Sequence, residues 1–261
     1  MLTLKGKNAI VCAGSSGIGK GIVSTLAEYG ANVTTFSRNI EKLDTVKREV
    51  REKTGRDINI IKGNLSKSDD IVNVVKSARE TFGNIDILVM NYGDPKVDKF
   101  MGISDDEWKY SIDMMLLSTI NLSRMVIPDM IQKNDGRIVY VTSMTTKNPL
   151  RNFSISNTLR SGIVALGKTL SIELAEKNIT VNSISQGFFN TDRLKNIIKR
   201  NSEELKITIE EATKNIENEI PMKRFGNPEE IGNLVAFLCS PLASYITGDN
   251  IQIDGGAVRS I

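Results

Sequence analysis

The chain alternates short apolar runs with amphipathic stretches, and this alternation limits the folds open to it. Seven runs have the length and composition of buried strands: Asn8–Cys12, Asn32–Phe36, Ile58–Ile61, Ile85–Val89, Arg137–Val141, Thr180–Ile184 and Asn250–Ile253. Helical periodicity lies between them, at Gly17–Tyr29, Lys42–Lys53, Asp69–Phe82, Asp105–Gln132, Ser154–Lys177 and Pro228–Cys239. A repeated strand–helix order is typical of a parallel sheet covered by helices on both faces. We therefore predict an α/β protein, with a doubly wound parallel seven-stranded sheet in a single domain over residues 1–261.

One segment departs from this alternation. Residues Thr191–Glu219 are polar and rich in charge, with helical periodicity and no strand. They follow the sixth predicted strand, and so they begin at the sheet edge where ligands bind in folds of this type. Two interpretations stay open for the region of about 190–220: a solvated helical hairpin, or a lid and substrate region over the crevice.

The first predicted strand runs into a glycine-rich turn, CAGSSGIGKGIV, and a helix is expected to begin at Gly17 or Ile18. Small residues in such a turn let backbone N–H groups approach a pyrophosphate at the helix N-terminus. Because the turn begins a long strand–helix series, we predict that it binds a dinucleotide. The alternative is a glycine turn in a fold that binds no ligand. Ala13 is expected to have a negative φ, with any unusual torsion at Gly14. The expected cofactor contacts are Ala13, Gly14, Ser15, Ser16, Gly17, Ile18 and Gly19.

The second predicted strand ends in FSRN, which bears on the choice of cofactor. An acidic side chain at this place would bind the ribose diol of NAD, whereas Ser37 and Arg38 offer a hydroxyl and a guanidinium suited to a 2′-phosphate. The alternative is that Arg38 is a solvated loop arginine. We favour NADP(H), and NAD(H) stays open.

The stretch GRIVYVTSMTTKNPLRNFSISNTLRSGIVALGK resembles the catalytic segment of the short-chain dehydrogenase/reductase (SDR) family. That segment has a Ser at the end of a strand and a Tyr-x-x-x-Lys pair on the next helix. Ser143 matches the Ser, whereas Ser156 and Arg160 occupy the Tyr and Lys positions. The glycine turn and IPMKRFGNPEEIGNLVAFLCSPLASYITGDNIQIDGG also resemble the family, so the resemblance covers essentially the whole chain.

The chain is thus identified as an atypical SDR member that resembles 3-oxoacyl-acyl-carrier-protein reductases. The resemblance implies a Rossmann-type fold and an NAD(P)(H)-dependent oxidoreductase that transfers hydride between nicotinamide and a carbonyl or alcohol substrate. It also implies further cofactor contacts by Asn64, Leu65, Asn91, Gly93, Arg160, Gln186, Gly187 and Thr191. Tyr92 departs from the family pattern, and it is either a packing aromatic or a phenol that reaches the substrate.

The substitutions at the catalytic positions remove the usual proton donor. A phenol has a pKa near 10, while an aliphatic hydroxyl is about as weak an acid as water, and this gap corresponds to roughly 8 kcal/mol. Arg160 shares a helix face with Ser156 and keeps the positive charge of the family's Lys. The family's relay Asn falls on Met115, which relays nothing. The candidate catalytic residues are Ser143, Ser156, Arg160 and Tyr92.

Two functions stay open. In the first, the chain is an oxidoreductase whose Ser143, Ser156 and Arg160 hold an oxyanion, with the proton coming from water or from a group such as Tyr92. In the second, it is a catalytically inactive dinucleotide-binding homologue with a redox-sensing or structural role. The substrate itself is not identified by any residue of the sequence.

Composition narrows the remaining classes of function. A net charge of +3 without a basic run argues against nucleic-acid binding. No apolar run has the length of a membrane span, so a membrane partner is not expected. The chain has no histidine, so imidazole catalysis is excluded and a metal site is not expected. Two cysteines fit a reducing, cytoplasmic setting. The apolar faces of Met114–Met130 and Ile155–Leu174 are compatible with a homo-oligomer, a tetramer or a dimer, although core packing also explains them.

Overall fold

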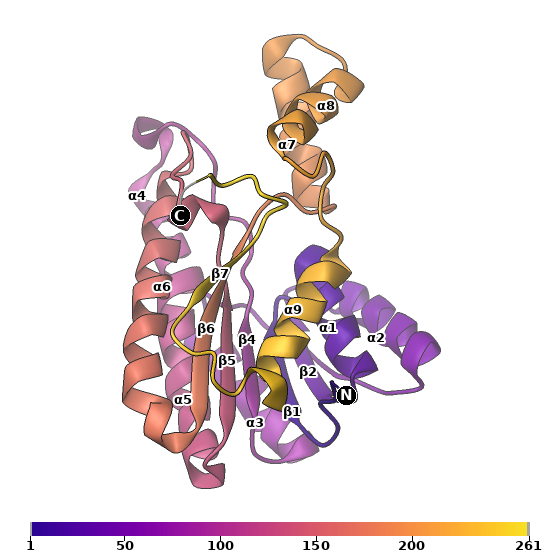
Figure 1. The fold of residues 1–261 in the computed structure, drawn as a ribbon, viewed down its shortest axis with the longest axis vertical. Coiled ribbons are helices and arrows are strands. Elements are labelled where there is room, and N and C mark those ends of the chain that lie inside the picture. The colour runs from indigo at the N-terminus through magenta and orange to yellow at the C-terminus, as the bar shows by residue number, and fades with distance from the viewer. Residues whose placement is uncertain (1, 260–261) are drawn as a thin grey trace.

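The computed structural model describes residues 2–259, and a parallel sheet forms its centre (Figure 1). The sheet has seven strands in the order β3-β2-β1-β4-β5-β6-β7, and all neighbouring strands are parallel. Their bounds are β1 Asn8–Cys12, β2 Asn32–Ser37, β3 Asn59–Lys62, β4 Ile87–Met90, β5 Gly136–Val141, β6 Ile179–Gln186 and β7 Asn250–Ile253. The predicted doubly wound sheet is confirmed, with strand ends displaced by up to two residues.

Helices cover both faces of this sheet. Their bounds are α1 Gly17–Glu28, α2 Ile40–Thr54, α3 Ser68–Phe82, α4 Asp105–Ser111, α5 Ser118–Lys133, α6 Ser154–Leu174, α7 Asp192–Leu205, α8 Ile209–Glu219 and α9 Pro228–Cys239. Alternate strand residues enter two separate clusters: Ile10 and Leu88 join the one under α3, α5 and α6, while Val11 and Val89 join the one under α1, α2 and α9. Strands buried on both faces need apolar residues in both registers, which explains their continuous apolar runs.

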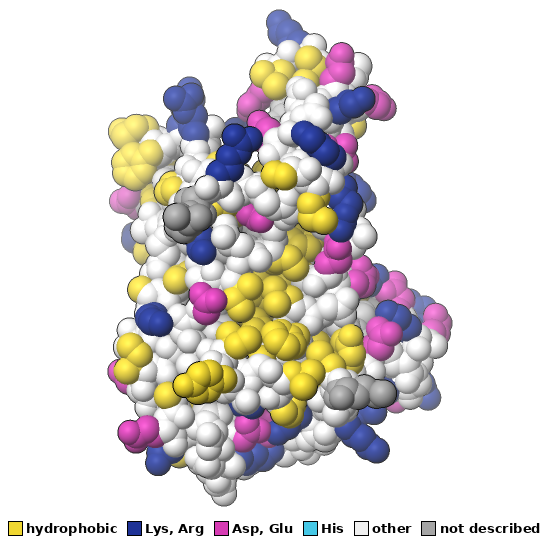
Figure 2. All heavy atoms as spheres, in the orientation of Figure 1, with side chains coloured by type: hydrophobic (Ala, Val, Ile, Leu, Met, Phe, Trp, Pro, Cys, Tyr) yellow, Lys and Arg dark blue, Asp and Glu magenta, His cyan; other side chains and the backbone are white. Residues whose placement is uncertain are grey.

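An apolar area covers part of the face on which β7 and α9 lie. Figure 2 shows it as a continuous yellow patch in the middle of that face. Partly buried side chains of these two elements include Leu234, Phe237, Ile251 and Ile253. The apolar faces of Met114–Met130 and Ile155–Leu174, which the sequence left open between an oligomer interface and core packing, contribute many side chains to the core.

The helix predicted over Asp105–Gln132 is interrupted, contrary to that prediction. A π-helical turn, Ile112–Leu117, separates α4 from α5. Ser118 Oγ donates to the Met114 carbonyl at 2.6 Å, and Thr119 Oγ1 donates to the Met115 carbonyl at 2.6 Å. Hydroxyls that bond to carbonyls one turn earlier compete with the backbone ladder, and they account for a local widening at this place. Apolar periodicity alone does not show this feature.

The polar segment after β6 forms the helices α7 and α8, which stand beyond the carboxyl edge of the sheet (Figure 1). Thr191 caps α7 by accepting from the Leu194 N–H, and Thr208 and Glu211 form a capping box at the start of α8. The two helices share a small apolar cluster made by Leu194, Ile198, Ala212, Ile216, Ile220 and Phe225. This cluster holds a helical pair over the edge where the ligand crevice is expected.

Candidate active site

The glycine-rich turn joins β1 to α1, and its backbone differs from the prediction at one residue. Ala13, not Gly14, has the left-handed φ, at 52°. Gly14 is needed for space, because a Cβ there would overlap Thr35 Oγ1 and crowd Val23. The expectation of a negative φ at Ala13 was therefore wrong: it considered torsion and missed the packing of the turn on β2. Left-handed backbone at alanine costs about 1–2 kcal/mol.

The first turn of α1 faces the crevice. The Ser16 side chain makes no capping hydrogen bond, which leaves first-turn N–H groups open to a ligand. A Cβ on Gly19 would collide with the Ala13 carbonyl, while Asn91 Nδ2 donates to that same carbonyl at 3.4 Å. The backbone is thus packed closely enough to bring N–H groups and the helix dipole to one point. This arrangement fits the pyrophosphate of a dinucleotide.

A cavity of about 470 Å³ runs along the carboxyl edge of the sheet from this turn. The sequence-predicted residues that line it are Ala13, Ser15, Ser16, Gly17, Ile18, Ser37, Arg38, Asn64, Leu65, Asn91, Tyr92, Gly93, Arg160, Gln186 and Thr191. The sequence-predicted residues that do not line it are Gly14, Gly19, Gly187, Ser143 and Ser156. A Cβ at Gly14, Gly19 or Gly187 would collide with neighbouring atoms. These glycines therefore allow close backbone packing behind the cavity, although they do not line it.

At the adenosine end of the cavity, Arg38 is exposed and its Nη1 donates to the Tyr110 hydroxyl at 3.3 Å. Ser37 Oγ is already engaged, since it donates to the Asn39 carbonyl and accepts from the Asn39 N–H. Lys42 lines the same end and adds a second cation. Sequence reasoning missed Tyr110 and Lys42. Lys42 lies in the first turn of α2, shortly after β2, and this position could have indicated that it faces the adenosine end.

At the opposite end, Ser156 and Arg160 form a fixed pair on α6. Arg160 Nε donates to Ser156 Oγ at 3.1 Å, and Nη1 donates to the Val141 carbonyl at 3.0 Å. Arg160 is only 4% exposed, yet it lines the cavity. Burial, together with the nearby Arg193 cation, lowers the pKa of Arg160 to about 10. The guanidinium is still positively charged at neutral pH, so this end of the cavity holds a fixed cation.

Ser143 lies beside this pair but bonds mainly to its own turn. Its Oγ accepts from the Thr145 N–H at 3.2 Å, and Thr145 Oγ1 lies 3.4 Å from Ser156 Oγ. Ser156 is 3% exposed. Thr145 thus links the turn of Ser143 to Ser156, which accepts from Arg160. Of Ser143, Ser156 and Arg160, it is Arg160 that faces the cavity.

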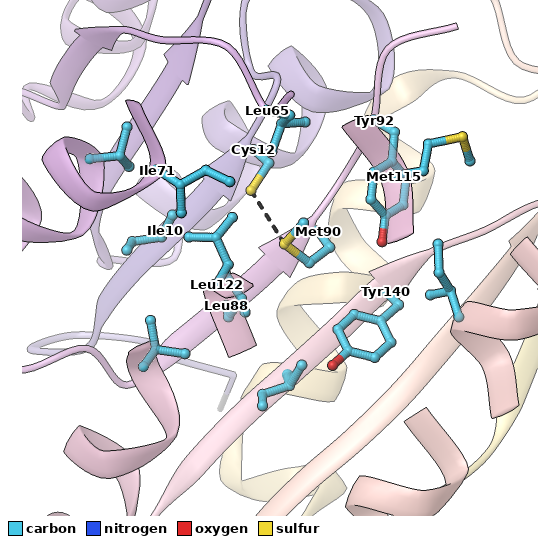
Figure 3. Packing of buried hydrophobic residues seen from close by; sticks show 14 of the residues in the cluster. Ile10, Cys12, Leu65, Ile71, Leu88, Met90, Tyr92, Met115, Leu122 and Tyr140 are labelled. Carbon is cyan, nitrogen blue, oxygen red and sulfur yellow. Dashed lines mark hydrogen bonds between the residues drawn. The ribbon is translucent and has the colours of Figure 1, made fainter. Parts of the chain in front are cut away.

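Tyr92 turns its hydroxyl away from the cavity. Its oxygen lies 2.7 Å from Thr119 Oγ1, and Figure 3 shows the ring within the buried cluster that also holds Met115 and Tyr140. Burial raises the pKa of this phenol well above its usual value. The guanidinium carbon of Arg160 lies 5.7 Å from the centre of the ring, within range of a cation–π contact. The geometry favours the packing interpretation of Tyr92.

Two charged residues at the nicotinamide end were missed. Asp94 follows β4, Arg193 lies in the first turn of α7, and the two form an ion pair. Both line the cavity, as does Asn196 one turn further along α7. Arg193 and Asn196 are three residues apart on a helix that begins at the crevice, and this spacing could have indicated that both face it. The sequence does not show the path of α7, however, and so it does not show which face of this helix points to the cavity.

The described residues contain neither a membrane-spanning helix nor a metal-binding cluster. Between residues 2 and 259, no helix is both long and apolar enough to cross a bilayer. The same residues include no group of three or more cysteines and carboxylates placed to hold a metal ion.

A crevice at the carboxyl edge of a doubly wound sheet, beginning at a glycine-rich turn, is the arrangement of a dinucleotide-binding class of protein. A family model described as "Enoyl-(Acyl carrier protein) reductase" matches residues 12–258. The chain belongs to the short-chain dehydrogenase/reductase family, as its motifs predicted.

Curated relatives agree with this assignment. The chain is 34% identical over 253 residues to the 3-oxoacyl-[acyl-carrier-protein] reductase FabG of Staphylococcus epidermidis, covering 96% of this chain and 98% of that protein. It is 35% identical over 260 residues to the oxidoreductase UcpA of Escherichia coli, covering 97% and 95%.

Solved structures agree as well. L-sorbose reductase from Gluconobacter frateurii, solved with NADPH and L-sorbose, has a TM-score of 0.94 at 29% identity and covers 100% of this chain and 99% of its own. YwfH, an NADPH-dependent reductase of bacilysin biosynthesis, has a TM-score of 0.92 at 30% identity and covers 98% and 99%.

Proposed function

We propose that this protein is an NADP(H)-dependent carbonyl reductase in which the Ser156–Arg160 pair stabilises negative charge on the substrate oxygen. The observation that carries the proposal is the buried Arg160 cation, held by the Ser156 hydroxyl and the Val141 carbonyl and open to the cavity. A fixed cation in a site of low polarity is worth far more to a developing oxyanion than the same charge in water.

The preference for NADP(H) over NAD(H) is part of this proposal. Arg38 and Lys42 are two cations at the adenosine end, and the described lining of that end has no carboxylate to bind a ribose diol. Two structural neighbours are NADPH-dependent or were solved with NADPH. A 2′-phosphate fits the charge of this end.

In the proposed reaction, bound NADPH supplies the hydride. The first turn of α1 would hold the pyrophosphate, and Asn91 fixes the turn by donating to the Ala13 carbonyl. Arg160 lies where it would donate to the nicotinamide ribose or the substrate oxygen. Ser156 orients Arg160 by accepting from Nε. The proton comes from water, because the Tyr92 hydroxyl is bonded to Thr119 inside the core.

The substrate is proposed to be a small carbonyl or alcohol compound. Relatives are named for 3-oxoacyl-carrier-protein reduction, and one structural neighbour reduces L-sorbose. We further propose one domain over residues 1–261 in which α7 and α8 act as a lid, a cytoplasmic location, and a homo-oligomer. The apolar patch over β7 and α9 supports the oligomer, and light scattering after size exclusion tests it.

A second function, dinucleotide binding without turnover, is favoured by one observation. Ser143 and Ser156 do not line the cavity, so neither hydroxyl is presented to a substrate in this conformation. This candidate predicts tight NADPH binding and no reduction of any carbonyl.

One experiment separates the two functions. NADPH and NADH binding are measured by fluorescence, and reduction is then assayed on a panel of ketones, aldehydes and oxoacyl thioesters. The double variant Ser156→Tyr with Arg160→Lys is assayed beside the wild type. Turnover by the wild type that Arg160→Met abolishes supports the enzyme. Binding without turnover, with activity gained only in the double variant, supports the inactive homologue.

A further inference from the structure

The ion pair between Asp94 and Arg193 connects the loop after β4 to the first turn of α7. Both residues line the cavity at its nicotinamide end. Their side chains keep 59% and 27% of their exposure, respectively. Partly exposed pairs of this type are weak and exchange partners readily. Neither residue belongs to the motifs that predict cofactor binding.

One cation at this end has no carboxylate partner within ion-pair distance among the described residues. Arg160 is buried, and none of the ion pairs among residues 2–259 includes it. The Arg193 cation is close enough to lower the pKa of Arg160, and Asp94 is a nearby carboxylate that acts in the opposite direction. Asp192 also lines the cavity, but it pairs with Lys195, and Asp94 pairs with Arg193. In the part of the chain that the structure describes, Arg160 is held by hydrogen bonds to neutral groups alone. A buried cation without an anionic partner is costly, so this end favours a further anion.

We propose that Arg193 recognises the carboxylate of an oxo-acid substrate and that Asp94 is an internal counterion which this carboxylate displaces. The inference rests on the proposed function and deepens it by naming the substrate class. Arginine presents a planar fork that matches a carboxylate through two parallel hydrogen bonds. The reaction would be oxo acid plus NADPH plus a proton giving hydroxy acid plus NADP⁺. Hydride goes to the carbonyl carbon, and a proton from water goes to the oxygen.

A phosphate of the cofactor is the other anion that Arg193 could bind. The two sources predict different effects of the same variant. If Arg193 binds a substrate carboxylate, its loss leaves NADPH affinity nearly unchanged. If it binds a cofactor phosphate, NADPH affinity falls and the preference among substrates does not change.

The test is a binding experiment that does not need turnover. The protein is saturated with NADP⁺, and calorimetry measures the affinity for 2-, 3- and 4-oxo acids, each beside its neutral primary amide. The variants are Arg193→Met, Arg193→Lys and Asp94→Asn. Arg200→Met is the matched control, because Arg200 lies on the same helix, bonds to the Val97 carbonyl and does not line the cavity. NADPH affinity and thermal unfolding are measured for every variant.

We expect at least one acid to bind about 10-fold or more tightly than its amide, as a charge-assisted pair predicts. Arg193→Met should abolish this preference and Arg193→Lys should keep part of it. Asp94→Asn should tighten acid binding, and Arg200→Met should change neither affinity. Equal binding of every acid and amide, or a loss of NADPH affinity in Arg193→Met with the preference intact, would overturn the inference. A wild type that binds neither NADPH nor NADP⁺ would instead refute the proposed function.

Discussion

Replacement of Arg38 by alanine should weaken NADPH binding selectively. Arg38 lies at the adenosine end of the cavity, where its guanidinium would donate to a 2′-phosphate. A hydrogen bond to a charged group contributes about 1.5–3 kcal/mol. Because Arg38 is exposed and already donates to the Tyr110 hydroxyl, the lower half of this range applies. The dissociation constant for NADPH should rise about 10-fold, while that for NADH stays within about 2-fold.

The assay is the enhancement of nicotinamide fluorescence on titration with each cofactor, repeated at low and high salt. Exposed charges are screened, so the effect of Arg38→Ala on NADPH should shrink as salt increases. Arg48→Ala is the control, since Arg48 lies on α2, bonds to Thr45 and does not line the cavity. The double variant with Lys42→Ala should lose more affinity than either single variant. A parallel loss of NADH and NADPH affinity in Arg38→Ala would refute the assignment of a 2′-phosphate site.

Three further predictions concern the turn and the catalytic end. Tyr92→Phe should lower the free energy of unfolding by about 1 kcal/mol through loss of the Thr119 hydrogen bond, with turnover within about 3-fold; a loss of activity of 100-fold or more would identify the phenol as the acid. Gly14→Ala should cost roughly 1–3 kcal/mol through overlap with Thr35, whereas Ala13→Gly, which relieves a positive φ, should stay within about 1 kcal/mol in denaturant unfolding. Burial lowers the pKa of Arg160 to about 10, so turnover should fall as pH rises through 10, and the group's contribution to the free energy of unfolding should increase above that pH; turnover that stays constant across this range would show that the cation is not used.

Most of the fold follows from patterns that the sequence carries locally. Strands buried on both faces give apolar runs in both registers, and helices between them give a 3.6-residue period. The carboxyl edge and its binding turn then follow from topology. The two differences at fold level have local causes that periodicity does not record. Hydroxyls at Ser118 and Thr119 widen a helix, and packing on Thr35, not backbone torsion, requires the glycine at position 14.

The candidate site was less predictable, because it depends on contacts between distant segments. Asp94 and Arg193 meet only because α7 returns over the loop after β4. The sequence does not distinguish a packing role from a chemical role for Tyr92, since the role depends on which neighbour its hydroxyl reaches. The structure supplies that neighbour, Thr119, from an element far along the chain.

The substitutions around Arg160 also bear on the choice between an enzyme and an inactive homologue. A lysine at this position would present three donors from a single nitrogen, while arginine spreads five donors over a wide planar fork. Here Ser156 accepts from Nε, the Val141 carbonyl accepts from Nη1, and the Tyr92 ring lies within cation–π range of the guanidinium. A tyrosine at 156 would carry its oxygen further from the helix than Ser156 does, so it would not accept from Arg160 Nε in the same way. The three residues therefore form one consistent arrangement that keeps a buried cation at the cavity. A buried cation lowers stability, so its presence indicates that the charge has a role at the cavity. Because Arg160 faces the cavity, we favour the proposed carbonyl reductase over the inactive homologue.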